Sequence, residues 1–116
     1  MLNLDNIPAR GLACHPGTIL KQEFLKPLNI TPAKLARDIS IPVQYIRSIV
    51  NGYDDITAMI ALLLAARFGN SYEYWMNLQL IYDTTKVLNS DVTLRDKLKA
   101  IESKFTQAER TTNAND

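Results

Sequence analysis

The sequence predicts an all-α fold, and three observations support this prediction. Helix-forming residues dominate, with only four Gly and five Pro among 116 residues. No segment alternates between apolar and polar residues with the period of a strand. Apolar residues instead recur three and four positions apart, which is the spacing of one helix face. Since a chain of this length builds one core, we expect a single bundle of five or six helices.

Prolines bound the first two expected helices. The first begins near His15, and we expect Pro27 to end it because proline disfavours helical backbone in the residue before it. The second begins with Thr31 as its cap and Pro32 at its first helical position, where the missing N–H has no helical partner to lose. This second helix is about two turns long. Its inward-facing residues are Leu35, Ala36 and Ile39.

A third helix follows after a very short break. We expect Ser40 to cap it, Pro42 to lie in its first turn, and Gly52 to supply the left-handed residue that ends it. Two short helices joined by so tight a turn form a helix-turn-helix unit, in which the second helix enters the major groove of DNA. The sequence therefore predicts a helix-turn-helix from Thr31 to Asn51.

The outward face of this third helix carries candidate base-contacting side chains. Arg47 can bind a guanine edge with two hydrogen bonds, which contributes about 1–3 kcal/mol of discrimination, and Gln44 can read adenine. Tyr45 suits a phosphate or a thymine methyl group, and Ser48 suits either role. The alternative interpretation is that these four are solvated surface residues without a ligand.

Residues near the ends of the motif are candidate contacts to the DNA backbone. Thr31, Lys34 and Asn51 would position the helix without specifying sequence, and Tyr53 completes the predicted set. A helix cap or a turn hydrogen bond explains Thr31 and Asn51 equally well. Residues 54–55 are both Asp, where a phosphate-binding protein is expected to carry Lys or Arg. They either repel phosphate, cap the next helical turn or face a basic partner protein.

Two further helices complete the expected bundle. The fourth, residues 58–68, is capped by Thr57 and ended by Gly69, and its apolar residues on nearly every side place it at the centre. Its expected buried residues are Leu62, Leu63, Leu64 and Phe68. Ser71 caps the fifth helix, which begins at Tyr72. Its apolar stripe comprises Trp75, Leu78, Ile81 and Tyr82.

Four regions are expected along the chain. They are an N-terminal arm (1–14), the helix-turn-helix domain (15–88), a C-terminal amphipathic helix (89–105) and a disordered tail (106–116) without apolar periodicity. The apolar stripe of the amphipathic helix comprises Leu94, Leu98, Ile101 and Phe105. This stripe either folds back onto the domain or packs on a second chain, as in two-fold dimers that bind paired half-sites.

Composition excludes several functional classes. The formal net charge is +1, from 13 basic and 12 acidic residues, so DNA affinity must come from local arrangement. Cys14 and His15 are adjacent and are the only Cys and His, so we expect no metal site and no nucleophilic pair. Scattered carboxylates and the absence of a Gly-rich phosphate loop predict no enzyme activity and no cofactor.

The sequence also predicts a cytoplasmic location. The longest apolar run, residues 58–68, is too short for a membrane span, and the start does not resemble a signal peptide. A single Cys suits the reducing cytoplasm.

Short motifs occur throughout the segment from His15 to Asp83. They are HPG at 15–17, LAR at 35–37, IVNG at 49–52, IT at 56–57 and FGNSYEYWMNLQLIYD at 68–83. With these motifs the segment resembles the HigA family of antitoxins, also called virulence-associated protein I, within the phage-repressor-like (XRE) helix-turn-helix group. The resemblance implies an antitoxin of a type II toxin-antitoxin module. Such an antitoxin neutralises a HigB-like, RelE-fold endoribonuclease toxin and, as a dimer, represses its own operon by binding operator DNA.

The sequence departs from that family at positions relevant to DNA binding. Family members usually carry Arg or Asn near the positions of Gln44 and Tyr45, and often a basic pair where this chain has Tyr53 and Asp54. Pro32 stands where the wider group often has Gln. Fewer phosphate contacts release fewer counterions and predict weaker affinity. The alternative function is therefore a protein-binding antitoxin or adaptor, or a solitary transcriptional regulator, with weakened DNA affinity.

Overall fold

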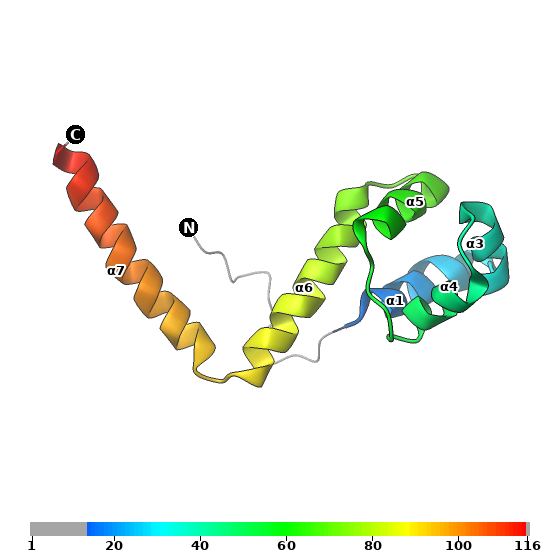
Figure 1. The fold of residues 1–116 in the computed structure, drawn as a ribbon, viewed down its shortest axis with the longest axis horizontal. Helices are drawn as coiled ribbons and strands as arrows, with labels where there is room; N and C mark the ends of the chain where they lie inside the picture. Colours follow the sequence, from blue (N-terminus) through cyan, green and yellow to red (C-terminus); the bar gives the residue numbers. More distant parts are fainter. Residues whose placement is uncertain (1–13, 116) are drawn as a thin grey trace. The chain divides into compact units, whose positions relative to one another are not determined.

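The computed structural model describes residues 14–115, with side chains described to Thr106. No strand occurs within this range, so the all-α prediction is confirmed. The elements are α1 (Pro16–Ile19), η1 (Leu20–Leu25), α2 (Lys26–Leu28), α3 (Pro32–Ile39), α4 (Val43–Val50), α5 (Ala58–Phe68), α6 (Tyr72–Ser90) and α7 (Leu94–Asn115) (Figure 1). Because α1, η1 and α2 follow one another without a break, they form one continuous N-terminal helix.

The chain divides into two compact units within α6. One unit ends at Asp83 and contains the N-terminal helix, α3, α4, α5 and the first part of α6. The other includes the chain from Thr84 onward, with the end of α6 and all of α7. The first compact unit therefore ends five residues before position 88, where we expected the helix-turn-helix domain to end.

The N-terminal helix differs from the expected one at Pro27. It continues through this residue and ends with Asn29 in the left-handed conformation (φ 56°), so the prediction that Pro27 ends it is wrong. The preceding segment, Leu20–Leu25, is π-helical, and Lys26 N–H donates to the carbonyl of Lys21. The wider π turn moves the carbonyl groups that the proline ring would otherwise meet, and so accommodates Pro27.

The π turn also changes which residues share a face. Leu20 and Leu25 lie five positions apart, and both are buried, with 0% and 3% of their surfaces exposed. In an α-helix, residues five positions apart lie about 140° apart around the axis. The π-helical segment instead places both leucines on the side of the helix that packs into the core.

The helix-turn-helix forms where it was predicted, but Ser40 has a different role. Thr31 caps α3, its Oγ1 accepting a hydrogen bond from Lys34 N–H at 3.1 Å, with Pro32 in the first turn. Ser40 is left-handed (φ 59°) and closes α3, because a turn this short needs such a residue to reverse the chain. The prediction that Ser40 caps the next helix is therefore wrong. Pro42 occupies that cap position, without a side-chain hydrogen bond, and not the first turn.

Four other predicted boundary residues, Gly52, Thr57, Gly69 and Ser71, are confirmed. Gly52 has a φ of 84° just beyond α4, and Gly69 has a φ of 73° at the end of α5. Thr57 Oγ1 accepts a hydrogen bond from the N–H of Ile60 at 3.3 Å. Ser71 Oγ accepts one from the first turn of α6, at 3.1 Å. Each of these signals is local in sequence, which is why it could be recognised without a structure.

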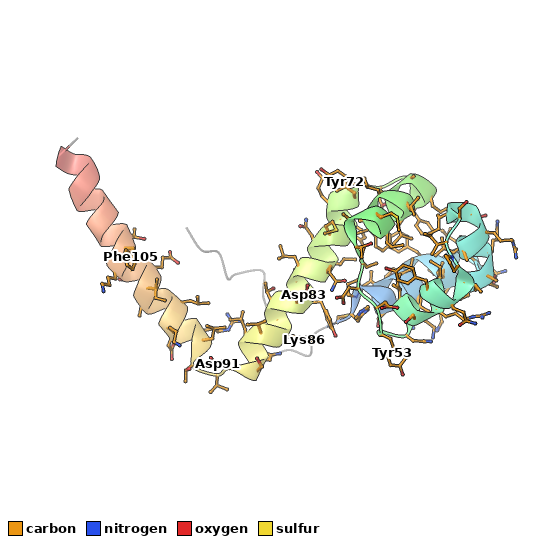
Figure 2. All side chains as sticks on the ribbon, viewed as in Figure 1. Tyr53, Tyr72, Asp83, Lys86, Asp91 and Phe105 are labelled. Carbon is orange, nitrogen blue, oxygen red and sulfur yellow. The ribbon has the colours of Figure 1, made fainter. Side chains whose placement is uncertain are left out.

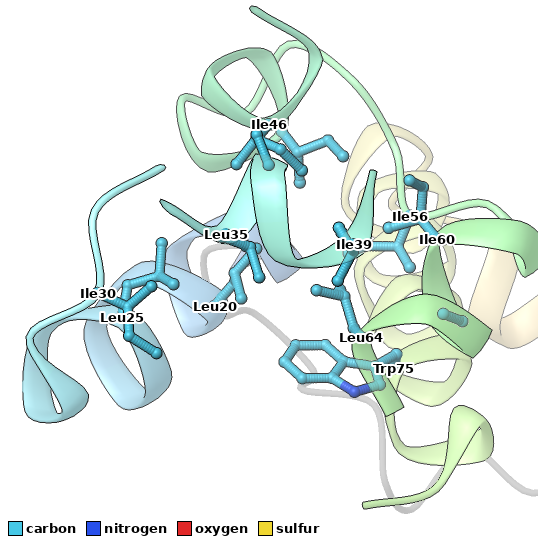
Figure 3. Packing of buried hydrophobic residues seen from close by; sticks show 13 residues of the cluster. Leu20, Leu25, Ile30, Leu35, Ile39, Ile46, Ile56, Ile60, Leu64 and Trp75 are labelled. Atoms are coloured by element: carbon cyan, nitrogen blue, oxygen red, sulfur yellow. The ribbon is translucent and has the colours of Figure 1, made fainter. Parts of the chain in front are cut away.

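The core of the first unit brings together residues from all of its helices (Figure 3). Its large members are Leu20, Leu25, Ile30, Leu35, Ile39, Ile46, Ile49, Ile56, Ile60, Leu64 and Trp75. The indole Nε1 of Trp75 donates to Asn70 Oδ1 at 2.9 Å, and its ring packs on Phe24 with centroids 4.7 Å apart. Trp75 of α6 is therefore part of the core.

α5 is less enclosed than its composition indicates. Ile60 and Leu64 are fully buried, whereas Met59 and Leu62 are 55% and 56% exposed. The prediction that Leu62 is buried at the centre of a bundle is wrong, because a unit this small covers only one face of α5.

α7 continues to Asn115, through the segment for which the sequence predicts a disordered tail. Gln, Ala, Glu and Arg at residues 107–110 are mostly good helix formers, which is consistent with this extension. The apolar stripe of α7 is incompletely covered, since Ile101 and Phe105 are 49% and 56% exposed. Among the helices described, none combines the length and the apolar character needed to cross a bilayer.

Candidate nucleic-acid interface

Two isoleucines anchor the inner side of α4 in the core, and the outer side of the helix presents polar groups. Ile46 and Ile49 are fully buried and fix the orientation of the helix. Gln44 and Arg47 are exposed, and Ser48 is half-buried, so the predicted outward face exists for these three residues. The helix can therefore present hydrogen-bonding side chains without disturbing its own packing.

Tyr45 behaves differently from its neighbours on α4. It is half-buried and packs against the core cluster. Its ring therefore helps to hold α4 on the scaffold. Tyr53, in contrast, projects from the loop after α4 (Figure 2) and is 83% exposed.

Lys34 is exposed, but an acidic neighbour shares its charge. Its Nζ lies 3.3 Å from Asp38 Oδ1, and Arg67 Nε lies 2.9 Å from Asp38 Oδ2. The hydrogen bond from Arg67, followed by that from Lys34, keeps the pKa of Asp38 below its usual value. The charge of Lys34 is thus partly neutralised within the fold. Its attraction for phosphate is therefore weaker than its exposed position would indicate.

Thr31, Arg47 and Asn51 line one cavity of about 430 Å³. The cavity lies among the N-terminal helix, the start of α3 and the end of α4. Lys21 and Lys26 also line it, and sequence reasoning missed both. The helical pattern places Lys21 only on the outer side of the first helix. The spacing that brings it together with Lys26 depends on a π turn, for which the sequence carries no local signal.

The loop after α4 is tied to the scaffold by a polar network. Asp55 Oδ1 accepts a hydrogen bond from Gln79 Nε2 at 3.1 Å and lies 4.0 Å from His15 Nε2. Gln79 Oε1 accepts a hydrogen bond from Ile56 N–H at 2.7 Å, and its Nε2 also donates to Asp83 Oδ1 at 3.0 Å. The Asp55 carboxylate is therefore engaged by groups of the fold.

The HPG motif has a packing role beneath the end of α4. His15 is buried, its Nδ1 accepts a hydrogen bond from Gly17 N–H at 2.9 Å, and its ring contacts Tyr82 edge-on with centroids 4.8 Å apart. A Cβ atom on Gly17 would lie 1.8 Å from the carbonyl oxygen of Ile49. Only glycine allows the N-terminal helix to approach α4 this closely.

The adjacent cysteine and histidine do not converge. Cys14 is exposed, whereas His15 is turned inward. The described part of the chain contains no group of three or more His, Cys, Asp or Glu side chains arranged to hold a metal ion.

Comparison with known proteins places this arrangement in a family. Residues 21–75 match the helix-turn-helix family model HTH_3. The chain is 39% identical over 71 residues to virulence-associated protein I of Dichelobacter nodosus, covering 61% of this chain and 66% of that protein. The matched segment thus spans just under two thirds of this curated relative.

Two solved structures share the fold over most of their length. Pseudomonas aeruginosa antitoxin HigA, solved with higBA promoter DNA, has a TM-score of 0.68 and 33% identity, covering 73% of this chain and 92% of that chain. An addiction module antidote protein of the HigA family from Coxiella burnetii has a TM-score of 0.69 and 36% identity, covering 75% and 95%. The chain therefore belongs to the HigA family of helix-turn-helix proteins.

Proposed function

We propose that the protein is a sequence-specific DNA-binding antitoxin that represses its own operon. The observation that carries this proposal is the presentation of α4, with Ile46 and Ile49 buried and Gln44, Arg47 and Ser48 on its outer side. A helix held in this way fits the major groove of B-DNA, where side chains reach base edges. The shared fold of a HigA antitoxin solved with promoter DNA supports the same conclusion.

The proposed DNA-contacting set has a base-reading part and a positioning part. Gln44 and Ser48 have polar side chains on the outer side of α4 and are suited to base edges. Thr31 and Asn51 lie at the start of α3 and the end of α4, where they can fix the register on the DNA backbone. The full set is Thr31, Lys34, Gln44, Tyr45, Arg47, Ser48, Asn51 and Tyr53.

The proposed partners are operator DNA, a RelE-like toxin and a second copy of the chain. Family membership supports the toxin, which the antitoxin would neutralise by binding and without enzymatic activity, in the cytoplasm. The half-exposed Ile101 and Phe105 on α7 support a contact between two copies, because a covered apolar stripe is more stable than one left in water. A two-fold dimer would match a palindromic operator.

The decisive experiment is a binding titration at fixed salt. Wild-type protein is titrated against the DNA upstream of its own gene and against a scrambled duplex. Specific binding predicts a preference of about 10³-fold or more for the upstream DNA. Gln44→Ala is expected to reduce that preference by roughly 5- to 150-fold at particular base pairs, and Gln22→Ala, on the exposed side of the N-terminal helix, to leave it unchanged.

Equal affinity for the two duplexes would refute the repressor function and favour the protein-binding alternative. Co-expression with the neighbouring reading frame tests the other half of the proposal. If that frame encodes a RelE-like toxin, growth arrest by the toxin alone should be relieved by this protein. Continued arrest in the presence of a stable antitoxin would exclude neutralisation.

A further inference from the structure

Three basic side chains in the first unit share one cleft and have no acidic partner there. Lys21, Lys26 and Arg47 line the cavity of about 430 Å³ described above, and none of its lining residues is Asp or Glu. Lys34 and Arg67, in contrast, share the carboxylate of Asp38. The three cleft residues form no ion pair with the described residues, so their positive charge is not neutralised within the fold.

The π turn places the two lysines side by side. In an α-helix, residues five positions apart would lie about 140° apart and would point to different sides. Here Lys26 N–H donates to the carbonyl of Lys21, so the two residues lie one turn apart along the same side of the helix. The turn that sends Leu20 and Leu25 into the core thereby sends Lys21 and Lys26 to the cleft. π turns recur at functional sites.

The neighbouring groups suit an anion with several oxygen atoms. Thr31 and Pro32, at the start of α3, form part of the wall, and the start of a helix carries partial positive charge. Asn51, at the end of α4, also lines the cavity, and an asparagine side chain carries an amide that can donate hydrogen bonds. Three full charges, an amide and a helix start together are complementary to a strand of phosphodiesters.

We propose that this cleft binds the sugar-phosphate backbone of DNA beside the groove that α4 enters. Lys21, Lys26 and Arg47 neutralise phosphates of one strand, while Gln44 and Ser48 face the base edges. This inference rests on the proposed DNA-binding function and assigns Arg47 a different role from the guanine contact expected from the sequence. It also supplies the phosphate contacts that the acidic loop after Gly52 lacks.

The test is the salt dependence of DNA affinity. Each neutralised phosphate contributes about −0.9 to the slope of log K against log [salt], so Lys21→Gln/Lys26→Gln should lower the magnitude of the slope by about 2. At about 0.1 M salt the double variant should bind roughly tenfold or more weakly, by the same factor on operator and scrambled DNA. Arg47→Gln should lower the slope by about 1 while retaining the preference for operator.

Lys99→Gln, which removes an exposed lysine charge from α7, is the matched control and should leave the slope unchanged. Thermal unfolding is measured for every variant to verify that it is folded. All variants are expected to fold because Lys21, Lys26 and Arg47 are exposed. An unchanged slope in the double variant would overturn the inference, as would loss of operator preference in Arg47→Gln with an unchanged slope. If wild-type protein binds both duplexes equally, the proposed repressor function fails, and the slope change on scrambled DNA still decides whether the cleft binds phosphate.

Discussion

The charged groups on the N-terminal helix and those on the loop after α4 differ in whether they have partners within the fold. Beside α4, Lys21 and Lys26 line a cleft without acidic side chains. Beyond Gly52, the Asp55 carboxylate is hydrogen-bonded to Gln79 of α6 and faces His15. The Asp55 carboxylate is thus held by the scaffold, while the basic cleft remains available to a ligand. The number of charged residues near α4 would have indicated the opposite, namely that the acidic loop governs the interaction with DNA and the N-terminal helix does not.

The largest expected effect comes from the close contact that supports α4. Gly17→Ala places a Cβ on the backbone carbonyl of Ile49, 1.8 Å away before any shift, and should destabilise the fold by about 3 kcal/mol or more. Urea unfolding measures this. Gly69→Ala is the comparison, since φ is positive but nothing lies within 4 Å, and about 1–2 kcal/mol is expected. Equal effects of the two variants would contradict the proposed steric cause.

The next effect concerns the network that holds the acidic loop. Gln79→Leu leaves the buried N–H of Ile56 without its acceptor and Asp55 without a donor. Loss of about 2 kcal/mol of unfolding free energy is expected in urea titrations, because a buried group left unpaired loses its water as well as its partner. The control is Asn77→Ala, on the exposed side of the same helix, which should change stability by no more than about 0.5 kcal/mol. A similar loss in both variants would show that the network contributes nothing specific.

The two helix-capping threonines allow the effect of a lost cap on stability to be distinguished from its effect on DNA binding. Thr57 and Thr31 each cap a helix, so substitution of either by Ala should destabilise the protein by about 1 kcal/mol. Of the two, only Thr31 lines the basic cleft. We therefore expect Thr31→Ala to weaken DNA binding in a titration and Thr57→Ala to leave it unchanged. Weakened binding by both variants would trace the effect to stability alone.

The smallest expected effect is on the pH dependence of stability, and it concerns Asp38, which pairs with Lys34 and Arg67. The pKa of Asp38 is lowered by Arg67 and Lys34, so this carboxylate stabilises the fold above its unfolded-state pKa. That contribution is lost as pH falls through the folded-state pKa, which lies below the unfolded-state one. Asp38→Asn should therefore flatten the decline in thermal stability on the acid side slightly, without changing the shape of the profile near neutral pH. An identical decline in wild type and variant would contradict this role.

Local signals in the sequence were sufficient for most of the first unit. Thr31, Thr57, Gly52 and Gly69 each act through atoms a few positions away, so their roles could be recognised from neighbours alone. Ser40 misled because a serine suits a helix start as well as a left-handed turn, and only the path of the chain decides between them.

The candidate site was less predictable because its assembly is not local. The bond from Gln79 to Asp55 joins residues 24 positions apart, and no spacing rule anticipates it. The cleft depends on a π turn, which a pattern with a period of 3.6 residues cannot reveal. Arg47, Thr31 and Asn51 could be assigned to one surface from the sequence, but their neighbours Lys21 and Lys26 required the fold.

The π turn also makes the N-terminal helix sensitive to its length. Deleting one residue within Leu20–Leu25 would let the segment relax to an α-helix and rotate everything before it by about 100°. Gly17 would then no longer face the carbonyl of Ile49, and His15 would leave Asp55. Substitutions on the exposed side of this helix should leave the fold intact, whereas a single-codon deletion should disrupt it. Relatives that share this packing are therefore expected to vary here in residue type and not in residue number.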